Sequence, residues 1–176
     1  MILHTILQFV LAFFIGSIPF GIIVCEFLKL KTPTSYGSGN IGASNVARQN
    51  LAAGALTLLL DASKGGLALL LLAPTDAVLL SVILGHCYSP VLNFNGGKGV
   101  ATAVGALLVS HTSPAIILMT LWGITFMHKR TPALSSIICS LMMLVYALLI
   151  PSYCLAAASA LIIIRHKSNI YAYQQS

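Results

Sequence analysis

Seven apolar segments separated by short polar loops constrain this chain more than any other feature. In order they are Ile2–Leu28, Leu51–Pro74, Ala77–Tyr88, Val100–Val109, Pro114–Met127, Leu134–Ile150 and Tyr153–Ile164. They are continuously apolar and lack the alternation of membrane β-barrel strands. Because backbone groups in lipid must be hydrogen-bonded within the protein, such segments predict membrane helices. We expect an all-α polytopic membrane protein with about seven transmembrane helices, forming one domain over residues 1–176.

Charge is too scarce here for a soluble domain. Only 7% of the residues are charged, whereas soluble domains carry about 25%. Several segments are shorter than the roughly 20 residues that cross a hydrocarbon core, so we expect some short or broken helices. Pro19 should free a carbonyl and kink the first helix. No basic region precedes the first apolar run, and we interpret Ile2–Val24 as a retained span, not a signal peptide.

Basic residues predict the topology. With seven crossings, alternate loops share one side of the membrane, and one side receives all the basic residues except Lys64. They are Lys29, Lys31, Arg48, Lys98, Lys129, Arg130, Arg165 and Lys167. Because basic loops favour the cytoplasm, the N-terminus is expected outside and the C-terminus in the cytoplasm. The net charge of +6 therefore indicates topology, and nucleic acid is not an expected partner.

The loop 93–99, Asn-Phe-Asn-Gly-Gly-Lys-Gly, has the composition of an anion site. Glycine allows backbone amides to approach a ligand, Lys98 adds a positive charge, and a helix from Val100 would direct its N-terminal amides here. The alternative is a flexible turn. A nucleotide P-loop is excluded, because no glycine stands five positions before Gly97 and no serine or threonine follows Lys98.

Two other polar stretches fall on the same predicted face. The first, residues 36–48, contains a Gly-x-Gly-x-x-Gly pattern, but no βαβ unit surrounds it, so a dinucleotide site is excluded. The second is Arg165–Ile170. We interpret Arg48 and Lys98 as phosphate ligands, because a guanidinium forks onto two phosphate oxygens and an ammonium adds a compact charge. The alternative, anchoring at the membrane interface, suits Lys29, Lys31, Lys129 and Lys167.

The remaining ionisable residues leave alternatives open. Asp61 and Lys64 stand three positions apart on one helix face, either as a structural pair or as part of a site. His166 is the only histidine in the basic tail, where it is a candidate general base or phosphate donor. The other histidines, His4, His86, His111 and His128, are expected at interfaces or in packing. Scattered cysteines and three carboxylates give no metal-ligand spacing, so neither metal nor cofactor is expected.

Several of these motifs together resemble the bacterial acyl-phosphate:glycerol-3-phosphate acyltransferase family. The matching stretches, in order, are Gly16–Gly21, Gly37–Asn45 with Arg48, Asp61–Gly65, Gly96–Thr102, Arg165-His166 and Asn169-Ile170. The resemblance implies a seven-span enzyme of the bacterial cytoplasmic (inner) membrane, with its active site on the cytoplasmic face. It implies transfer of a fatty acyl group from acyl phosphate to the 1-hydroxyl of glycerol 3-phosphate, giving lysophosphatidic acid and phosphate for phospholipid biosynthesis.

The same resemblance implies the site residues. The candidate catalytic residues are Ser38, Arg48, Lys98, His166 and Asn169, and the candidate substrate- and phosphate-binding residues are Asn45, Gly96, Gly97 and Gly99. Ser136, Asp61 and Lys64 are further candidates. The expected partners are the two substrates and membrane lipids, and the oligomeric state is left open.

The chain also departs from the family pattern. Ile41 stands where proline is frequent, and Ser44 stands where threonine is frequent. Ala133 replaces the first serine of a Ser-Leu-x-Ser pattern, which leaves Ser136 as the candidate there. The alternative function is a small membrane transporter for an organic phosphate, which would use the intramembrane Asp61 and Lys64.

Overall fold

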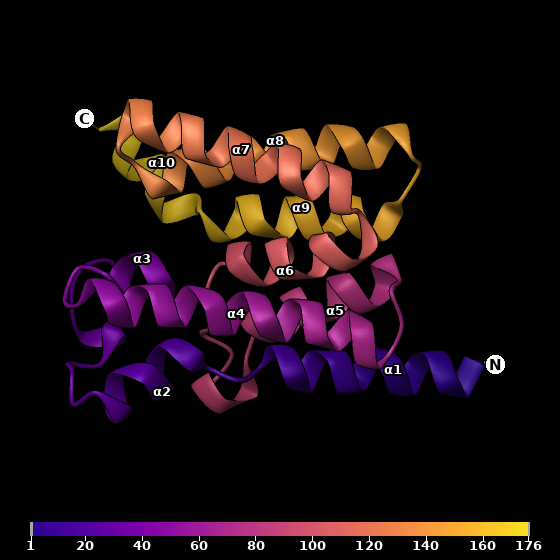
Figure 1. The fold of residues 1–176 in the computed structure, drawn as a ribbon, viewed down its shortest axis with the longest axis horizontal. Helices are drawn as coiled ribbons and strands as arrows, with labels where there is room; N and C mark the ends of the chain where they lie inside the picture. The colour runs from indigo at the N-terminus through magenta and orange to yellow at the C-terminus, as the bar shows by residue number, and fades with distance from the viewer. Residues whose placement is uncertain (1, 176) are drawn as a thin grey trace.

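The computed structural model describes residues 2–175, which form a bundle of helices without a strand (Figure 1). The helices are α1 (Ile2–Gly16), α2 (Phe20–Phe27), α3 (Ala43–Val46), α4 (Leu51–Leu71), α5 (Asp76–Cys87), α6 (Val100–Ser110), α7 (Thr112–Lys129), α8 (Pro132–Leu149), α9 (Tyr153–Arg165) and α10 (Lys167–Gln174). Two 3-10 turns, Pro33–Ser35 and Pro90–Leu92, lie in the loops. The all-α prediction is confirmed for the described part of the chain.

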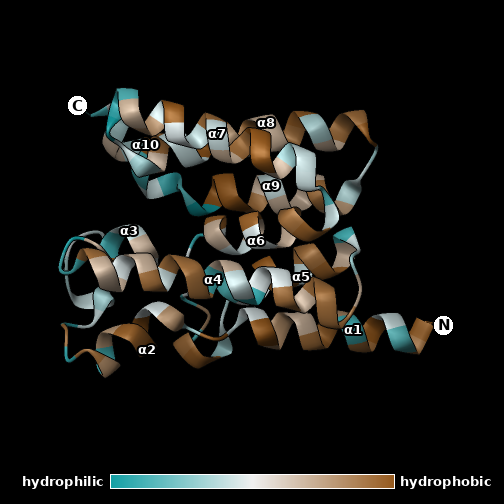
Figure 2. Cartoon of the chain, in the orientation of Figure 1, coloured by the Kyte–Doolittle hydropathy of each residue, from teal (hydrophilic) through white to brown (hydrophobic). Residues whose placement is uncertain are grey.

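Within residues 2–175, three helical stretches are both long and apolar enough to cross a membrane: Ile2–Phe27, Leu51–Leu71 and Pro132–Leu149. Most of the large outward side chains on them are apolar; Leu71 and Leu149 are 72% and 76% exposed. Large apolar side chains in such numbers on an outer surface are suited to lipid contact. Hydrophilic residues gather in the loops, on α3 and on α10 (Figure 2).

The first apolar segment is broken at Pro19, as its sequence predicts. Helix α1 ends at Gly16 and α2 begins at Phe20. The Ile18 carbonyl in the break accepts a hydrogen bond of 2.8 Å from Lys64 Nζ on α4, so a side chain from another helix satisfies this backbone group. The end of the chain differs from expectation: only a polar tail was predicted, whereas Lys167–Gln174 forms α10, a helix without an apolar segment.

Helix α5 lies inside the bundle and contacts α1, α4, α6 and α9. Its Leu79, Val82 and Ile83 are fully buried. Helices α4 and α6 approach especially closely, because a Cβ added to Gly105 would lie 1.8 Å from the Ala62 carbonyl oxygen. Small residues that bring helix backbones together are typical of membrane bundles.

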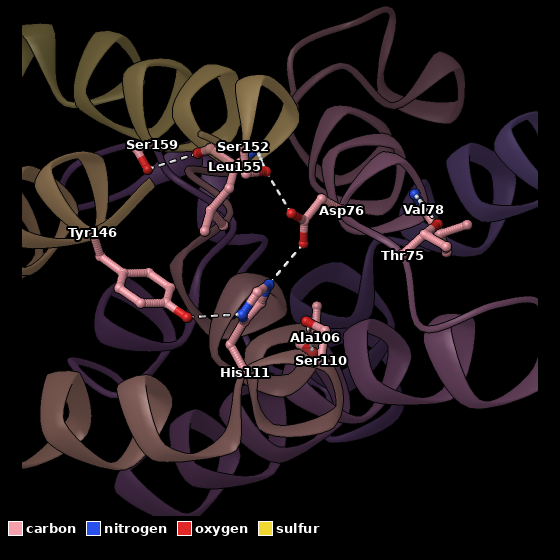
Figure 3. A network of polar contacts seen from close by, with 10 residues as sticks. All are labelled: Thr75, Asp76, Val78, Ala106, Ser110, His111, Tyr146, Ser152, Leu155 and Ser159. Carbon is pink, nitrogen blue, oxygen red and sulfur yellow. Dashed lines mark hydrogen bonds and ion pairs between the residues drawn. The ribbon is translucent and has the colours of Figure 1, made fainter. Parts of the chain in front are cut away.

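A polar network joins three loops at the end of the bundle where the N-terminus lies (Figures 1 and 3). Asp76 Oδ1 lies 2.8 Å from His111 Nε2, and Asp76 also accepts a hydrogen bond from Ser152. His111 Nδ1 is 3.1 Å from the hydroxyl of Tyr146. His111, expected at an interface or in packing, thus has two partners from distant helices. This cluster, Asp76–His111–Tyr146–Ser152, is named the Asp76 network below.

Candidate active site

The three polar stretches that the sequence places on one face meet around a single cavity of about 540 Å³. The lining residues are Ser38, Gly39, Asn40, Tyr88, Asn95, Gly96, Lys98, Ile164, Arg165, Lys167, Ser168, Asn169 and Ala172. They come from the loop before α3, the loop before α6, and the junction of α9 with α10. The expectation that these stretches gather is confirmed, and the cavity contains three of the candidate catalytic residues, Ser38, Lys98 and Asn169.

Positive charge in the cavity has no carboxylate to balance it. Lys98, Arg165 and Lys167 line it, whereas the three carboxylates of the chain, Glu26, Asp61 and Asp76, do not. Lys98 is half-buried and donates a hydrogen bond to Asn169 Oδ1. Burial, with a smaller contribution from the charge of Arg165, lowers the pKa of Lys98. An external anion would relieve this repulsion between cations.

The glycine-rich loop of residues 93–99, called the glycine loop below, is held by hydrogen bonds on two sides. The Gly96 and Gly97 amides donate to the carbonyls of Cys87 and His86, over 3.1 and 3.0 Å, at the C-terminal end of α5. Arg165 donates from the opposite side, with Nε 3.1 Å from the Gly97 oxygen and Nη2 2.8 Å from the Gly96 oxygen. Both amides, which were expected to bind phosphate, thus donate to backbone carbonyls in this structure, and Gly96 also lines the cavity.

The rest of the loop keeps donors available. No hydrogen bond joins the Lys98 or Gly99 amide to any other group between residues 2 and 175. Gly99 has φ of +83° at the start of α6, a conformation that favours glycine and turns the chain into the helix. On this loop the Lys98 ammonium lines the cavity and is therefore placed where it could meet an anion.

Arg165 is the site residue that sequence reasoning did not select. Its guanidinium lies 5.2 Å from the centre of the Tyr88 ring, as well as across the two glycine carbonyls. Its position beside His166 in the basic tail was the available signal. Its partners stand 68 and 69 residues earlier in the chain, so only the fold shows what it holds.

Two candidates from the first polar stretch occupy different places. Ser38 is exposed at the cavity, and its amide donates to Asn45 Oδ1. Asn45 is buried, and its Nδ2 donates to the carbonyls of Pro33, Tyr36 and Asn40. Asn45, which was expected to contact substrate, thus holds the shape of this loop through these hydrogen bonds. Arg48 is exposed and does not line the cavity.

His166 lies beside the cavity without lining it. Its ring is buried, and Nδ1 is 2.8 Å from the Ile162 carbonyl, so Nδ1 carries the hydrogen and donates it. Burial lowers the pKa of His166 to about 4, and the nearby charge of Lys98 also lowers it. The imidazole is therefore neutral at pH 7. Ser136 bonds Trp122 and Pro132 on α7 and α8 and does not line the cavity.

Asp61 and Lys64 are buried together in α4. Asp61 Oδ1 is 2.8 Å from Lys64 Nζ, and Lys64 donates to the Ile18 carbonyl. Neither lines the cavity. The intramembrane pair that suggested a transporter is thus engaged within the protein. Within residues 2–175, no three His, Cys, Asp or Glu residues are grouped so that they could hold a metal.

A family model and several known proteins match this chain over most of its length. A family model described as glycerol-3-phosphate acyltransferase matches residues 6–175. A protein of Bordetella pertussis named glycerol-3-phosphate acyltransferase is 41% identical over 181 residues, covering 92% of this chain and 84% of that protein. A protein of the same name from a Jannaschia species is 40% identical over 172 residues, covering 91% of this chain and 84% of that protein.

Two solved structures are also similar. Both are of PlsY (YgiH), an integral membrane glycerol 3-phosphate acyltransferase, in a glycerol 3-phosphate form and a lysophosphatidic acid form. Each is 29% identical in sequence and covers 97% of this chain and 92% of the solved chain, with TM-scores of 0.87 and 0.85.

Proposed function

The chain belongs to the glycerol-3-phosphate acyltransferase family, and from this premise we propose that it transfers a fatty acyl group from acyl phosphate to the 1-hydroxyl of glycerol 3-phosphate. The products are lysophosphatidic acid and phosphate. The observation that carries this proposal is the cavity in which Lys98, Arg165 and Lys167 meet no carboxylate. Both substrates are phosphate anions, so each supplies the charge that the cavity lacks.

Catalysis follows from holding two anions together. The hydroxyl oxygen of glycerol 3-phosphate attacks the acyl carbonyl carbon, the carbon–oxygen bond to phosphate breaks, and phosphate leaves. Acyl phosphate is already an activated mixed anhydride, so no covalent enzyme intermediate is needed. Lys98, held by Asn169, neutralises one phosphate against repulsion from the other, and positioning supplies much of the acceleration.

A phosphate oxygen of the substrate is the proposed acceptor of the hydroxyl proton. A phosphate monoester has its second pKa at about 6, whereas the pKa of His166 is lowered to about 4. The phosphate is thus the stronger base, and it lies within the cavity that His166 does not line. His166 then acts as a positioning residue at the junction of α9 and α10.

An apolar groove beside the cavity suits the acyl chain of the donor. Its lining residues are Ala133, Leu134 and Ile137 of α8 together with Asn169, Ile170 and Tyr173 of α10. Asn169 lines both the groove and the polar cavity. An acyl phosphate with its chain in the groove would therefore place its head group beside Lys98.

We propose that residues 1–176 form a single domain and that the protein lies in the bacterial cytoplasmic (inner) membrane. We propose seven crossings, an outside N-terminus and a cytoplasmic site. This is supported by the partition of basic residues and by the two termini, which lie at opposite ends of the bundle (Figure 1). Reporter fusions test it: a C-terminal green fluorescent protein should fluoresce, and an equally active C-terminal alkaline phosphatase fusion would contradict the topology.

The activity is tested with purified protein in detergent, glycerol 3-phosphate and an acyl phosphate of defined chain. We expect equal amounts of lysophosphatidic acid and released phosphate, each dependent on both substrates. Phosphate release without lysophosphatidic acid would contradict the proposal. Product formed from acyl-CoA but not from acyl phosphate would contradict the proposed donor while retaining acyl transfer.

A further inference from the structure

The glycine loop packs against His86, a buried polar residue that the proposed reaction does not use. His86, in the last turn of α5, is 4% exposed, and Asp61, on α4, is 2% exposed. Polar groups in such an environment are costly unless they are paired. The sequence suggested only packing or an interface for His86.

His86 contacts Gly97 in two ways. Its carbonyl oxygen accepts the Gly97 amide over 3.0 Å. Its ring also rests against the Gly97 Cα, because a Cβ added there would lie 2.1 Å from His86 Nε2. Only glycine fits at this approach. The position of the imidazole therefore limits where Gly97, and with it the neighbouring Lys98, can lie.

The other edge of the imidazole faces Asp61. His86 Nδ1 lies 3.6 Å from Asp61 Oδ1, whereas a hydrogen bond to nitrogen spans about 2.7–3.2 Å. Both atoms are buried without a hydrogen-bond partner in the described chain. Lys64 forms an ion pair with the same carboxylate oxygen but directs its hydrogen bond to Ile18. The Asp61 carboxylate can therefore still accept a hydrogen bond from His86. A small shift of the ring would bring the two atoms within hydrogen-bonding distance.

We propose, on the basis of the acyl transfer inferred above, that His86 is a positioning residue which links the buried Asp61 to Gly97 and so sets the place of Lys98 in the cavity. The link runs from α4, through the imidazole, to the underside of the glycine loop. Arg165 holds the opposite side of that loop. His86 and Arg165 then fix the loop from opposite sides, while Lys98 lines the cavity.

Variants of His86 separate positioning from packing. His86→Phe keeps a ring against Gly97 but removes the donor, whereas His86→Asn keeps a donor near the place of Nδ1. We expect His86→Phe to lower kcat/KM by about 10- to 100-fold, since a displacement of about 1 Å has effects of that size. His86→Asn should recover at least about a third of the lost activity on a logarithmic scale. Adding Asp61→Asn to His86→Phe should lower the kcat/KM of the folded protein little further, because the link is already broken, but it should lower the melting temperature, because Lys64 loses its counter-ion.

Ser81→Ala is the matched control. Ser81 is another buried polar residue of α5, but its hydroxyl bonds Phe9 of α1, away from the loop. Its removal should lower the melting temperature and leave kcat/KM of the folded protein unchanged. Wild-type kcat/KM in His86→Phe would overturn the proposal, as would a His86→Asn variant no better than His86→Phe at equal melting temperature.

Inorganic phosphate keeps this test independent of the proposed activity. If the wild-type protein makes no lysophosphatidic acid, the proposed function fails, and the loop is then examined by the rise in melting temperature on adding phosphate. The positioning role is supported if phosphate clearly raises the melting temperature of the wild type and if His86→Phe weakens the apparent phosphate affinity at least about tenfold. An equal rise in both proteins, or none in either, overturns it.

Discussion

Helix α9 begins at one polar cluster and ends at another, and the two clusters are built differently. At its start, Ser152 and His111 both bond the carboxylate of Asp76 (Figure 3). At its end, Arg165 and the nearby Lys98 bond only neutral oxygens, those of the glycine loop and of Asn169. The Asp76 network thus contains its own anion, whereas the cavity contains none.

This difference separates a structural cluster from a binding cluster. In the Asp76 network a carboxylate already occupies the donors, so an added anion would gain little. In the cavity the cations repel one another, so an added anion gains their full attraction at a partly buried site. In a chain with only three carboxylates, their placement is therefore more informative than the placement of its basic residues.

Removing the charge of Lys98 should have the largest effect. We expect Lys98→Ala to abolish lysophosphatidic acid formation, a loss of at least about 1000-fold, because the charge acts in a preorganised and partly dry site. Lys129→Ala, which removes an exposed lysine at the end of α7, should retain activity. Product assays on folded, detergent-purified variants decide this, and near-wild-type turnover in Lys98→Ala would sink the assignment.

Replacing the fork of Arg165 should have the next largest effect. Arg165→Lys keeps the charge but cannot span the carbonyls of Gly96 and Gly97. We expect kcat/KM to fall by about 10- to 100-fold as the loop loosens. Steady-state kinetics on the purified variant measure this. If the lysine variant has wild-type kcat/KM, the positive charge alone accounts for the role of Arg165 in activity. Its hydrogen bonds to Gly96 and Gly97 would then not matter for the reaction.

Acid should destabilise the cavity end through His166. The pKa of His166 is lowered to about 4 in the folded protein from its usual 6.5, so the unfolded chain binds the proton first. Stability is complete above pH 6.5 and falls as the pH drops toward 4, by up to about 3 kcal/mol. Melting temperatures across this range should fall less in His166→Asn, which does not titrate. Parallel curves for the two proteins would contradict this.

Breaking the Asp76 network should have the smallest effect and none on chemistry. We expect Asp76→Asn to lower stability by about 1 kcal/mol, because the contacts of this side chain with His111 and Ser152 are weakened. The kcat/KM of the folded protein should not change. Thermal melts with product assays on the same sample measure both. A large loss of activity at unchanged melting temperature would mean that this cluster serves the reaction.

The sequence predicted the fold class and the gathering of the polar stretches for identifiable reasons. Continuous apolar runs predicted the helices, and the partition of basic residues placed the loop of Lys98 beside Asn169, 71 residues away. Local composition missed α10, because its residues are polar. It also missed the pairs His111–Asp76 and His86–Asp61, since each depends on which helix faces come together. The inward orientation of Asn45 has the same cause.

Calorimetric titration of glycerol 3-phosphate tests the central claim most directly, because it measures binding in the cavity without the reaction. The wild type and Asp76→Asn should bind one equivalent with the same affinity, and Lys98→Ala should show at least about a tenfold weaker affinity. Equal affinity in Lys98→Ala, or a loss in Asp76→Asn as large as that in Lys98→Ala, would contradict the division of the molecule into a self-paired end and an anion-binding end.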